Sequence, residues 1–178
     1  NSASSVALKH LVKKTQKSCV IFNVIDPLIK AISNDKKIKN IGVIGTNATI
    51  YSGVYEQYIY QVRPDIKTYS LATPILASLI EEDNEKLYTS GVIESYLSHK
   101  VFNSIDTLIL GCTHYPLIES KIKDFYQKKI KIISSLNYIG NHVKDILSNL
   151  NLLNKSVETT SKYSFYVSDY TDNFQKKN

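Results

Sequence analysis

Residues 108–118 read Leu108-Ile-Leu-Gly-Cys-Thr-His-Tyr-Pro-Leu-Ile118, and they carry the strongest structural signal in the chain. An apolar run ends at Gly111-Cys112, and Pro116 favours the first turn of a helix. This order predicts a strand, a tight turn that presents a cysteine, and then a helix. Unpaired backbone N–H groups and the positive end of the helix dipole favour a thiolate at such a turn. Cys112 is therefore a candidate catalytic residue, and the alternative is a small buried hydrophobic residue.

Apolar runs and helical patterns alternate along the rest of the chain, which is typical of an α/β fold with a largely parallel sheet. Further strands are predicted at 18–25, 41–45, 68–72, 107–110, 129–133 and 163–167. Helices are predicted from Pro27 onward and at 46–60, 74–82, 85–98, 117–126 and 141–150. Residues 151–162 are rich in Asn, Ser, Thr and Lys, and this composition predicts a loop.

The composition indicates a globular protein and argues against two classes of partner. The chain has 178 residues, of which 43% are hydrophobic and 21% charged. Its net charge is +6, but the lysines are spread along the chain and Arg63 is the only arginine, so no nucleic-acid partner is expected. No apolar run is long enough to span a membrane, and no membrane partner is expected. Two cysteines without metal-type spacing predict a reducing, cytoplasmic setting and no metal site.

The cysteine-bearing segment resembles the second cysteine motif of the glutamate racemases, cofactor-independent enzymes that interconvert L- and D-glutamate. Other segments resemble this family in the same order along the chain. Residues 41–49 with 52–55 resemble its threonine-bearing turn, and residues 72–81 resemble its Ala-Cys-Pro segment, with Thr73 in place of the cysteine. The remaining matches are residues 24–27 and 165–174. The resemblance therefore covers nearly the whole chain.

The resemblance implies an α/β fold with two similar domains, each a largely parallel sheet flanked by helices, and an active site in the cleft between them. On this basis residues 26–133 form the second racemase domain, whereas residues 1–25 and 134–178 belong to the first. Residues 1–8 resemble the segment that follows the family's first catalytic cysteine, and that cysteine is absent here. We expect the chain to be an N-terminally truncated fragment whose first domain is incomplete.

Racemisation removes the α-proton from one face of the amino acid and delivers a proton to the other face, so it calls for two bases. The resemblance implies that Cys112 is one of two catalytic thiols, that His114 assists its proton transfer, and that Glu81 is a polar partner. It also implies that Asn1, Ser2, Thr46, Thr49 and Thr113 bind the substrate. Two of these residues have simpler alternatives. Thr46 is also a typical helix N-cap, and Glu81 is also a typical solvated acid at a helix end.

The predicted function is the cofactor-independent interconversion of L- and D-glutamate in the cytoplasm, which supplies D-glutamate for peptidoglycan. The expected partner is a small-molecule substrate, and the resemblance is compatible with a homodimer of the full-length protein. Because one catalytic thiol is absent, we expect the 178-residue chain to be inactive alone. Three alternatives stay open: an aspartate racemase, which His114 disfavours; a Cys–His hydrolase; and a non-catalytic interaction module.

Overall fold

The computed structural model describes residues 1–15, 19–82, 86–154, 164 and 166. Contacts between residues divide the chain into two units, Asn1–Val143 and Lys144–Asn178. The first unit contains the whole sheet. In the second unit the described residues are the last turns of α9 (Leu136–Asn149), the short segment 150–154 that follows it, and residues 164 and 166. The strand predicted at 163–167 and the match at 165–174 fall mostly outside the described residues.

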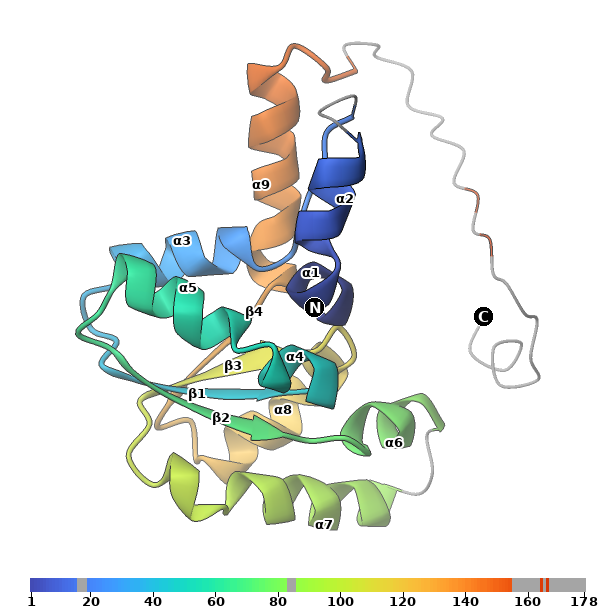
Figure 1. Cartoon of the computed structure of the whole chain (residues 1–178). Helices are drawn as coiled ribbons and strands as arrows, with labels where there is room; N and C mark the ends of the chain where they lie inside the picture. The colour runs from blue at the N-terminus through green and yellow to red at the C-terminus, as the bar shows by residue number, and fades with distance from the viewer. Residues whose placement is uncertain (16–18, 83–85, 155–163, 165, 167–178) are drawn as a thin grey trace. The chain divides into compact units, whose positions relative to one another are not determined.

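The first unit is built on a four-stranded sheet whose strand order is β2-β1-β3-β4 (Figure 1). All three strand pairings are parallel, which confirms the predicted α/β class. The strands are β1 (Asn40–Gly45), β2 (Lys67–Ala72), β3 (Thr107–Gly111) and β4 (Lys131–Ser134). Each lies within two residues of its predicted position.

Helices cover both faces of this sheet, and for this reason all five residues of β3 are buried (Figure 1). Successive side chains of a strand point to opposite faces. Ile109 therefore packs with α3 (Asp26–Asn34) and α5 (Val54–Val62), whereas its neighbours pack on the other face. Leu108 and Leu110 pack there with α6 (Leu76–Glu82), α7 (Lys86–Leu97) and α8 (Glu119–Phe125). Two hydrophobic clusters thus cover the two faces of the sheet.

The strand predicted at 18–25 is wrong for the residues that the structure describes, because none of residues 19–25 lies in a strand. The Asn23 side chain provides the physical reason. Its Oδ1 accepts hydrogen bonds from the backbone N–H groups of Ile25 at 3.0 Å and Asp26 at 2.9 Å. This local turn starts α3 and competes with strand formation. Val20, which the strand would have buried, is 44% exposed.

The single helix predicted at 46–60 is two helices, α4 (Asn47–Tyr51) and α5. Gly53 separates them with a φ of 62°, a left-handed conformation that breaks the helical path. Two helices near the N-terminus, α1 (Ser2–Val6) and α2 (Leu8–Thr15), had no sequence prediction. Helix α1 packs against α4 at the end of β1 and so brings Asn1 and Ser2 to the sheet.

Candidate active site

Three neighbouring strands end side by side, and the residues that follow them form the floor of the candidate site. Gly45 at the end of β1 pairs with Ala72 of β2 and with Gly111 of β3. The residues that directly follow these three strand ends are Thr46, Thr73 and Cys112. In open parallel sheets, ligands bind beyond the carboxyl ends of the strands. The register therefore places Cys112 where a ligand site is expected.

Gly111 permits the close approach of β1 and β3 just before the cysteine. A Cβ at this position would lie 2.7 Å from the carbonyl oxygen of Ile44, which is closer than real Cβ atoms come to backbone. The two strands would have to separate to admit a side chain. The Gly-Cys order thus has a packing reason that is independent of the chemistry of the thiol.

Cys112 is 7% exposed and opens the turn that leads into a 3-10 helix, η2 (Tyr115–Ile118), and then α8. The predicted helix at 117–126 therefore begins with a tighter turn. The Sγ of Cys112 lies 3.5 Å from Nδ1 of His114. The Nε2 of His114 lies 2.6 Å from Oε1 of Glu81, at the end of α6. The three predicted catalytic residues are thus in contact, in the order thiol, imidazole, carboxylate.

This order gives the thiol a route for its proton. A carboxylate at Nε2 favours the imidazole tautomer that carries its proton there, and this leaves Nδ1 as the acceptor that faces the thiol. The imidazole is 36% exposed and the Glu81 side chain 61% exposed, so both contact solvent while Cys112 is buried. Protons can therefore pass between water and the buried sulfur through His114.

Ser2, Thr46 and Thr49 form a second group, a cluster of hydroxyls. Ser2 Oγ lies 2.8 Å from Thr46 Oγ1 and 3.3 Å from Thr49 Oγ1, and the two threonine oxygens are 3.2 Å apart. Thr46 is also the N-cap of α4, since its oxygen accepts from the backbone N–H of Thr49. The N-cap role and membership of the cluster therefore coexist.

Asn1 joins this region through Tyr55, a residue that the sequence analysis did not single out. The Tyr55 hydroxyl donates to Oδ1 of Asn1 at 2.5 Å, and Tyr55 itself is 1% exposed. The Nδ2 of Asn1 is buried without a hydrogen-bond partner among the described residues. Burial, and then the negative charge of Cys112, raise the pKa of Tyr55 far above its usual value. Tyr55 is therefore a neutral donor to the asparagine.

Thr113 is the one predicted residue that joins neither group. It is exposed on the turn between Cys112 and His114, and in the described part of the chain its side chain makes no hydrogen bond to the other candidates. The second cysteine, Cys19, lies at the start of the strand predicted at 18–25. It is exposed, because the strand that would bury it does not form. Within the described residues no cluster of potential metal ligands is found.

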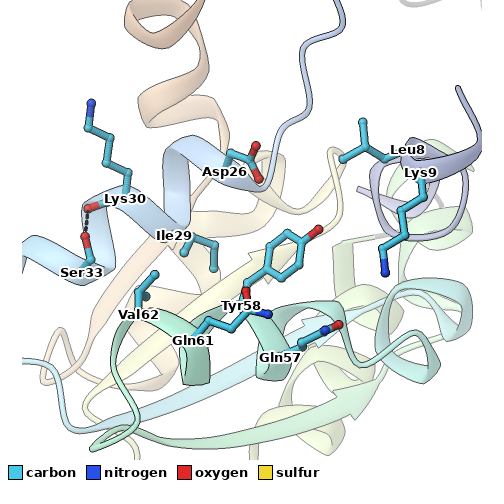
Figure 2. Close-up of a pocket in the computed structure, with 10 residues that line it drawn as sticks. All are labelled: Leu8, Lys9, Asp26, Ile29, Lys30, Ser33, Gln57, Tyr58, Gln61 and Val62. Atoms are coloured by element: carbon cyan, nitrogen blue, oxygen red, sulfur yellow. Dashed lines mark hydrogen bonds between the residues drawn. The ribbon is translucent and has the colours of Figure 1, made fainter. Parts of the chain in front are cut away.

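A cavity of about 670 Å³ lies elsewhere, between α2, α3 and α5 (Figure 2). Tyr58 of α5 and Ile29 of α3 face each other across it, and Lys9 of α2 lies at one end. None of the predicted catalytic or substrate-binding residues lines this cavity. Among the described residues, no helix is both long enough and apolar enough to cross a membrane.

Comparison with known proteins gives a consistent answer. No family model matches the chain. The glutamate racemase of Sulfurihydrogenibium sp. is 36% identical over 99% of this chain, and that of Aquifex aeolicus is 35% identical over 99%. In both cases the match covers 64% of the relative, so the chain spans slightly less than two thirds of the length of these enzymes.

Solved structures agree. The Francisella tularensis glutamate racemase in complex with D-glutamate matches 98% of this chain and 64% of its own, at 31% identity and a TM-score of 0.85. The Bacillus anthracis isoform RacE1 matches 88% of this chain and 58% of its own, at 36% identity and a TM-score of 0.77. Over nearly its whole length, this chain is similar in sequence and in fold to the glutamate racemases.

Proposed function

We propose that the chain belongs to a cofactor-independent glutamate racemase in which Cys112 is one of two acid/base thiols. The observation that carries this proposal is the contact sequence from Cys112 through His114 to Glu81, at the carboxyl end of a parallel sheet. The similarity to glutamate racemases over 99% of the chain supports the same assignment. The product, D-glutamate, would serve peptidoglycan synthesis and hence cell shape, in the cytoplasm.

In the proposed mechanism the Cys112 thiolate removes the α-proton from one face of glutamate. In the reverse direction the thiol returns a proton to that face, and His114 exchanges protons between the sulfur and water while Glu81 orients the imidazole. A second thiol on the opposite face completes the inversion. The other cysteine of the 178 residues, Cys19, is exposed and lies in the segment before α3. These residues therefore supply one base, and we expect no net racemisation by them alone.

The hydroxyl cluster and Asn1 are the proposed substrate-binding side. Ser2, Thr46 and Thr49 offer donors for a carboxylate, and the unpartnered Nδ2 of Asn1 offers one more. Thr113, exposed beside the thiol, is the proposed contact on the other side. Glutamate carries two carboxylates and an ammonium group. Hydroxyl and carboxamide groups suit it because they can donate to the carboxylates and accept from the ammonium group.

The two-domain assignment is part of this proposal. All four strands lie within residues 40–134, which supports residues 26–133 as one racemase domain. Residues 1–25 and 134–178 would then belong to the other domain, with the substrate in the cleft between them. Asn1 and Ser2 would approach the substrate from the first domain.

The proposal is tested by incubating the purified chain with D- or L-glutamate in D₂O. The α-proton is followed by NMR, and the enantiomer ratio by chiral chromatography. A single positioned base exchanges the α-proton of one enantiomer without producing the other. Cys112→Ser abolishes this exchange, whereas Cys19→Ser, the matched control, leaves it unchanged. Accumulation of the opposite enantiomer would overturn the one-base account. Absence of exchange, together with no protection of Cys112 from alkylation by glutamate, would overturn the assignment to glutamate.

The order thiol, imidazole, carboxylate also favours a second candidate, a Cys–His hydrolase in which the thiolate is a nucleophile. An activated ester such as p-nitrophenyl acetate distinguishes the two. A hydrolase would form an acyl group on Cys112 and release it with multiple turnovers. The racemase assignment predicts at most a stable acyl adduct, detected by peptide mass spectrometry.

A further inference from the structure

Behind Cys112, two buried hydroxyl groups join the loops that follow three strands. Tyr115 and Thr73 are both fully buried, and their hydroxyl oxygens are 2.6 Å apart. The Tyr115 hydroxyl also donates to the carbonyl oxygen of Thr73 at 3.2 Å. The Thr73 hydroxyl donates to the carbonyl oxygen of Gly45 at 3.1 Å. We call Tyr115, Thr73 and Gly45 the strand-end network.

One arrangement of hydrogens satisfies all three contacts. The single hydrogen of the Thr73 hydroxyl is donated to the carbonyl oxygen of Gly45, which can only accept. The single hydrogen of the Tyr115 hydroxyl is then shared between the hydroxyl oxygen of Thr73 at 2.6 Å and the carbonyl oxygen of Thr73 at 3.2 Å. Burial raises the pKa of Tyr115 far above its usual value; the hydrogen bond with Thr73 offsets part of this rise, and the negative charge of Cys112 adds a smaller increase. The phenol thus keeps its proton and remains a donor throughout the pH range in which proteins are stable.

The strand-end network connects both sides of the candidate site. Tyr115 belongs to the turn that begins at Cys112, and its backbone N–H donates to the Cys112 carbonyl at 3.3 Å. Gly45 directly precedes Thr46 of the hydroxyl cluster. The network therefore links the loop that bears the thiol to the loop that bears the proposed substrate-binding hydroxyls. The link runs through the loop after β2, the edge strand that pairs with β1.

Packing alone does not call for hydroxyls here. A phenylalanine and a valine would fill nearly the same volume, and buried hydroxyls are costly unless they are hydrogen-bonded. What the hydroxyls add is direction, because a hydrogen bond holds two groups at a fixed distance and angle whereas hydrophobic contact does not. The thiol and the imidazole of His114 lie at a contact distance of 3.5 Å, which a small displacement of the turn would break.

We propose that Tyr115 and Thr73 are positioning residues, which fix the Cys112 turn so that the thiol meets His114. This role rests on the proposed function, because that function is what makes Cys112 a catalytic thiol. The strand-end network itself makes no contact that needs glutamate, so it can be tested without substrate.

The test is the rate of alkylation of Cys112 by iodoacetamide in the full 178-residue chain. Peptide mass spectrometry separates Cys112 from Cys19, and the exposed Cys19 serves as an internal reference for the reagent. The variants are Tyr115→Phe, Thr73→Val and Thr73→Ser. Tyr115→Phe and Thr73→Val each remove one hydroxyl group and leave the other residue with a hydrogen-bond partner. In Tyr115→Phe the Thr73 hydroxyl keeps its bond to Gly45, and in Thr73→Val the tyrosine keeps its bond to the backbone carbonyl of residue 73.

A loosened turn exposes the buried thiol, so Tyr115→Phe and Thr73→Val should alkylate at Cys112 on the order of three- to tenfold faster. Thr73→Ser keeps the hydroxyl and should retain the parent rate. A His114→Gln substitution should change the rate in the parent chain but not in the Tyr115→Phe chain, because the turn no longer holds the thiol against residue 114.

Tyr126→Phe is the matched control, since its hydroxyl donates to the carbonyl oxygen of Leu97 at 3.3 Å and is not part of the strand-end network. It should lower stability by a similar amount without changing the Cys112 rate. The inference is overturned if Tyr115→Phe and Thr73→Val leave the Cys112 rate equal to that of Tyr126→Phe, or if Thr73→Ser behaves like Thr73→Val. If Tyr115→Phe does not fold, the comparison of Thr73→Val with Thr73→Ser decides the question. Failure of the glutamate experiment leaves these rates unaffected, so the two proposals fail separately.

Discussion

His114 and Glu81 lie 33 residues apart in the sequence, yet the Nε2 of the imidazole is 2.6 Å from Oε1 of the carboxylate. The contact joins the turn after β3 to the end of α6. Since the other imidazole nitrogen faces the Cys112 thiol, the carboxylate acts on the sulfur only through His114. This relationship separates a chemical role for Glu81 from a structural one, because a largely exposed ion pair contributes little to stability.

Glu81→Gln is therefore expected to change the chemistry of Cys112 more than the stability of the fold. The free energy of unfolding should fall by less than about 1 kcal/mol. The pH dependence of Cys112 alkylation should change, because the glutamine holds the imidazole without a negative charge. Urea unfolding and alkylation rates measure the two effects. Glu82→Gln, the neighbouring acid on α6, is the control and should leave the alkylation profile unaltered. A similar change in both variants would contradict the prediction.

Gly111→Ala should separate β1 from β3. The added Cβ would meet the Ile44 carbonyl at 2.7 Å, and backbone on both sides has little freedom to move. We expect a loss of about 1–3 kcal/mol in the free energy of unfolding, as for other overpacked cores. Gly140→Ala in α9 is the control, since a Cβ there meets nothing within 4 Å. It should be neutral or stabilise by about 0.5–1 kcal/mol, because alanine favours a helix over glycine. Denaturant unfolding of the parent and both variants measures these values, provided that the dependence of the unfolding free energy on denaturant concentration is the same in all three.

Tyr55→Phe should release Asn1 without disturbing the core. The ring stays buried, while the hydrogen bond to Oδ1 of Asn1 is lost, at a cost of about 0.5–1.5 kcal/mol. If the carboxamide of Asn1 holds glutamate, protection of Cys112 from alkylation should need more D-glutamate in this variant. Tyr58→Phe, which lies in the same helix and lines the separate cavity, is the control. Equal protection in all three chains would show that Tyr55 does not orient Asn1 for a ligand.

Asp35 and Lys131 give a prediction for pH. The hydrogen bond from Lys131, whose Nζ lies 2.8 Å from the carboxylate, holds the pKa of Asp35 below its ordinary value of 3.8. A carboxylate with a depressed pKa in the folded state stabilises the fold above that ordinary value and loses this effect as the pH falls through the folded-state value. Asp35→Asn should therefore be less stable than the parent at pH 6, and the difference should shrink toward zero as the pH falls below about 4. Urea unfolding across this range measures it. A difference that stays constant with pH would contradict the assignment.

The positions of the strands were predictable because they depend on local patterns. The apolar runs that became β1 and β3 are bounded by charged or polar residues on one side and by glycine on the other. The turn at Cys112 was predictable for the same reason. The resemblance to a known family then suggested roles for His114 and Glu81 that local patterns could not provide.

The segment at 19–25 shows where local patterns fail. It is apolar enough for a strand, but a strand also needs a neighbour to pair with, and among the described residues none pairs with it. Without a neighbouring strand, the backbone N–H groups of Ile25 and Asp26 donate to the Asn23 side chain instead. The division of the predicted helix at 46–60 had a signal in Ser52-Gly53, which periodicity alone did not weigh against the helical pattern.

By itself, the sequence determined the α/β class, the order of the strands along the chain and the placing of Cys112 on a turn after a strand. These three features depend on patterns among residues that are close together in the sequence. Only the tertiary structure decided that Ser2 meets Thr46, that Tyr55 holds Asn1, and that Tyr115 and Thr73 join three loops behind the thiol. The physical reason is that such contacts connect residues 42 to 54 positions apart, and the register of parallel strands and the packing of helices bring them together.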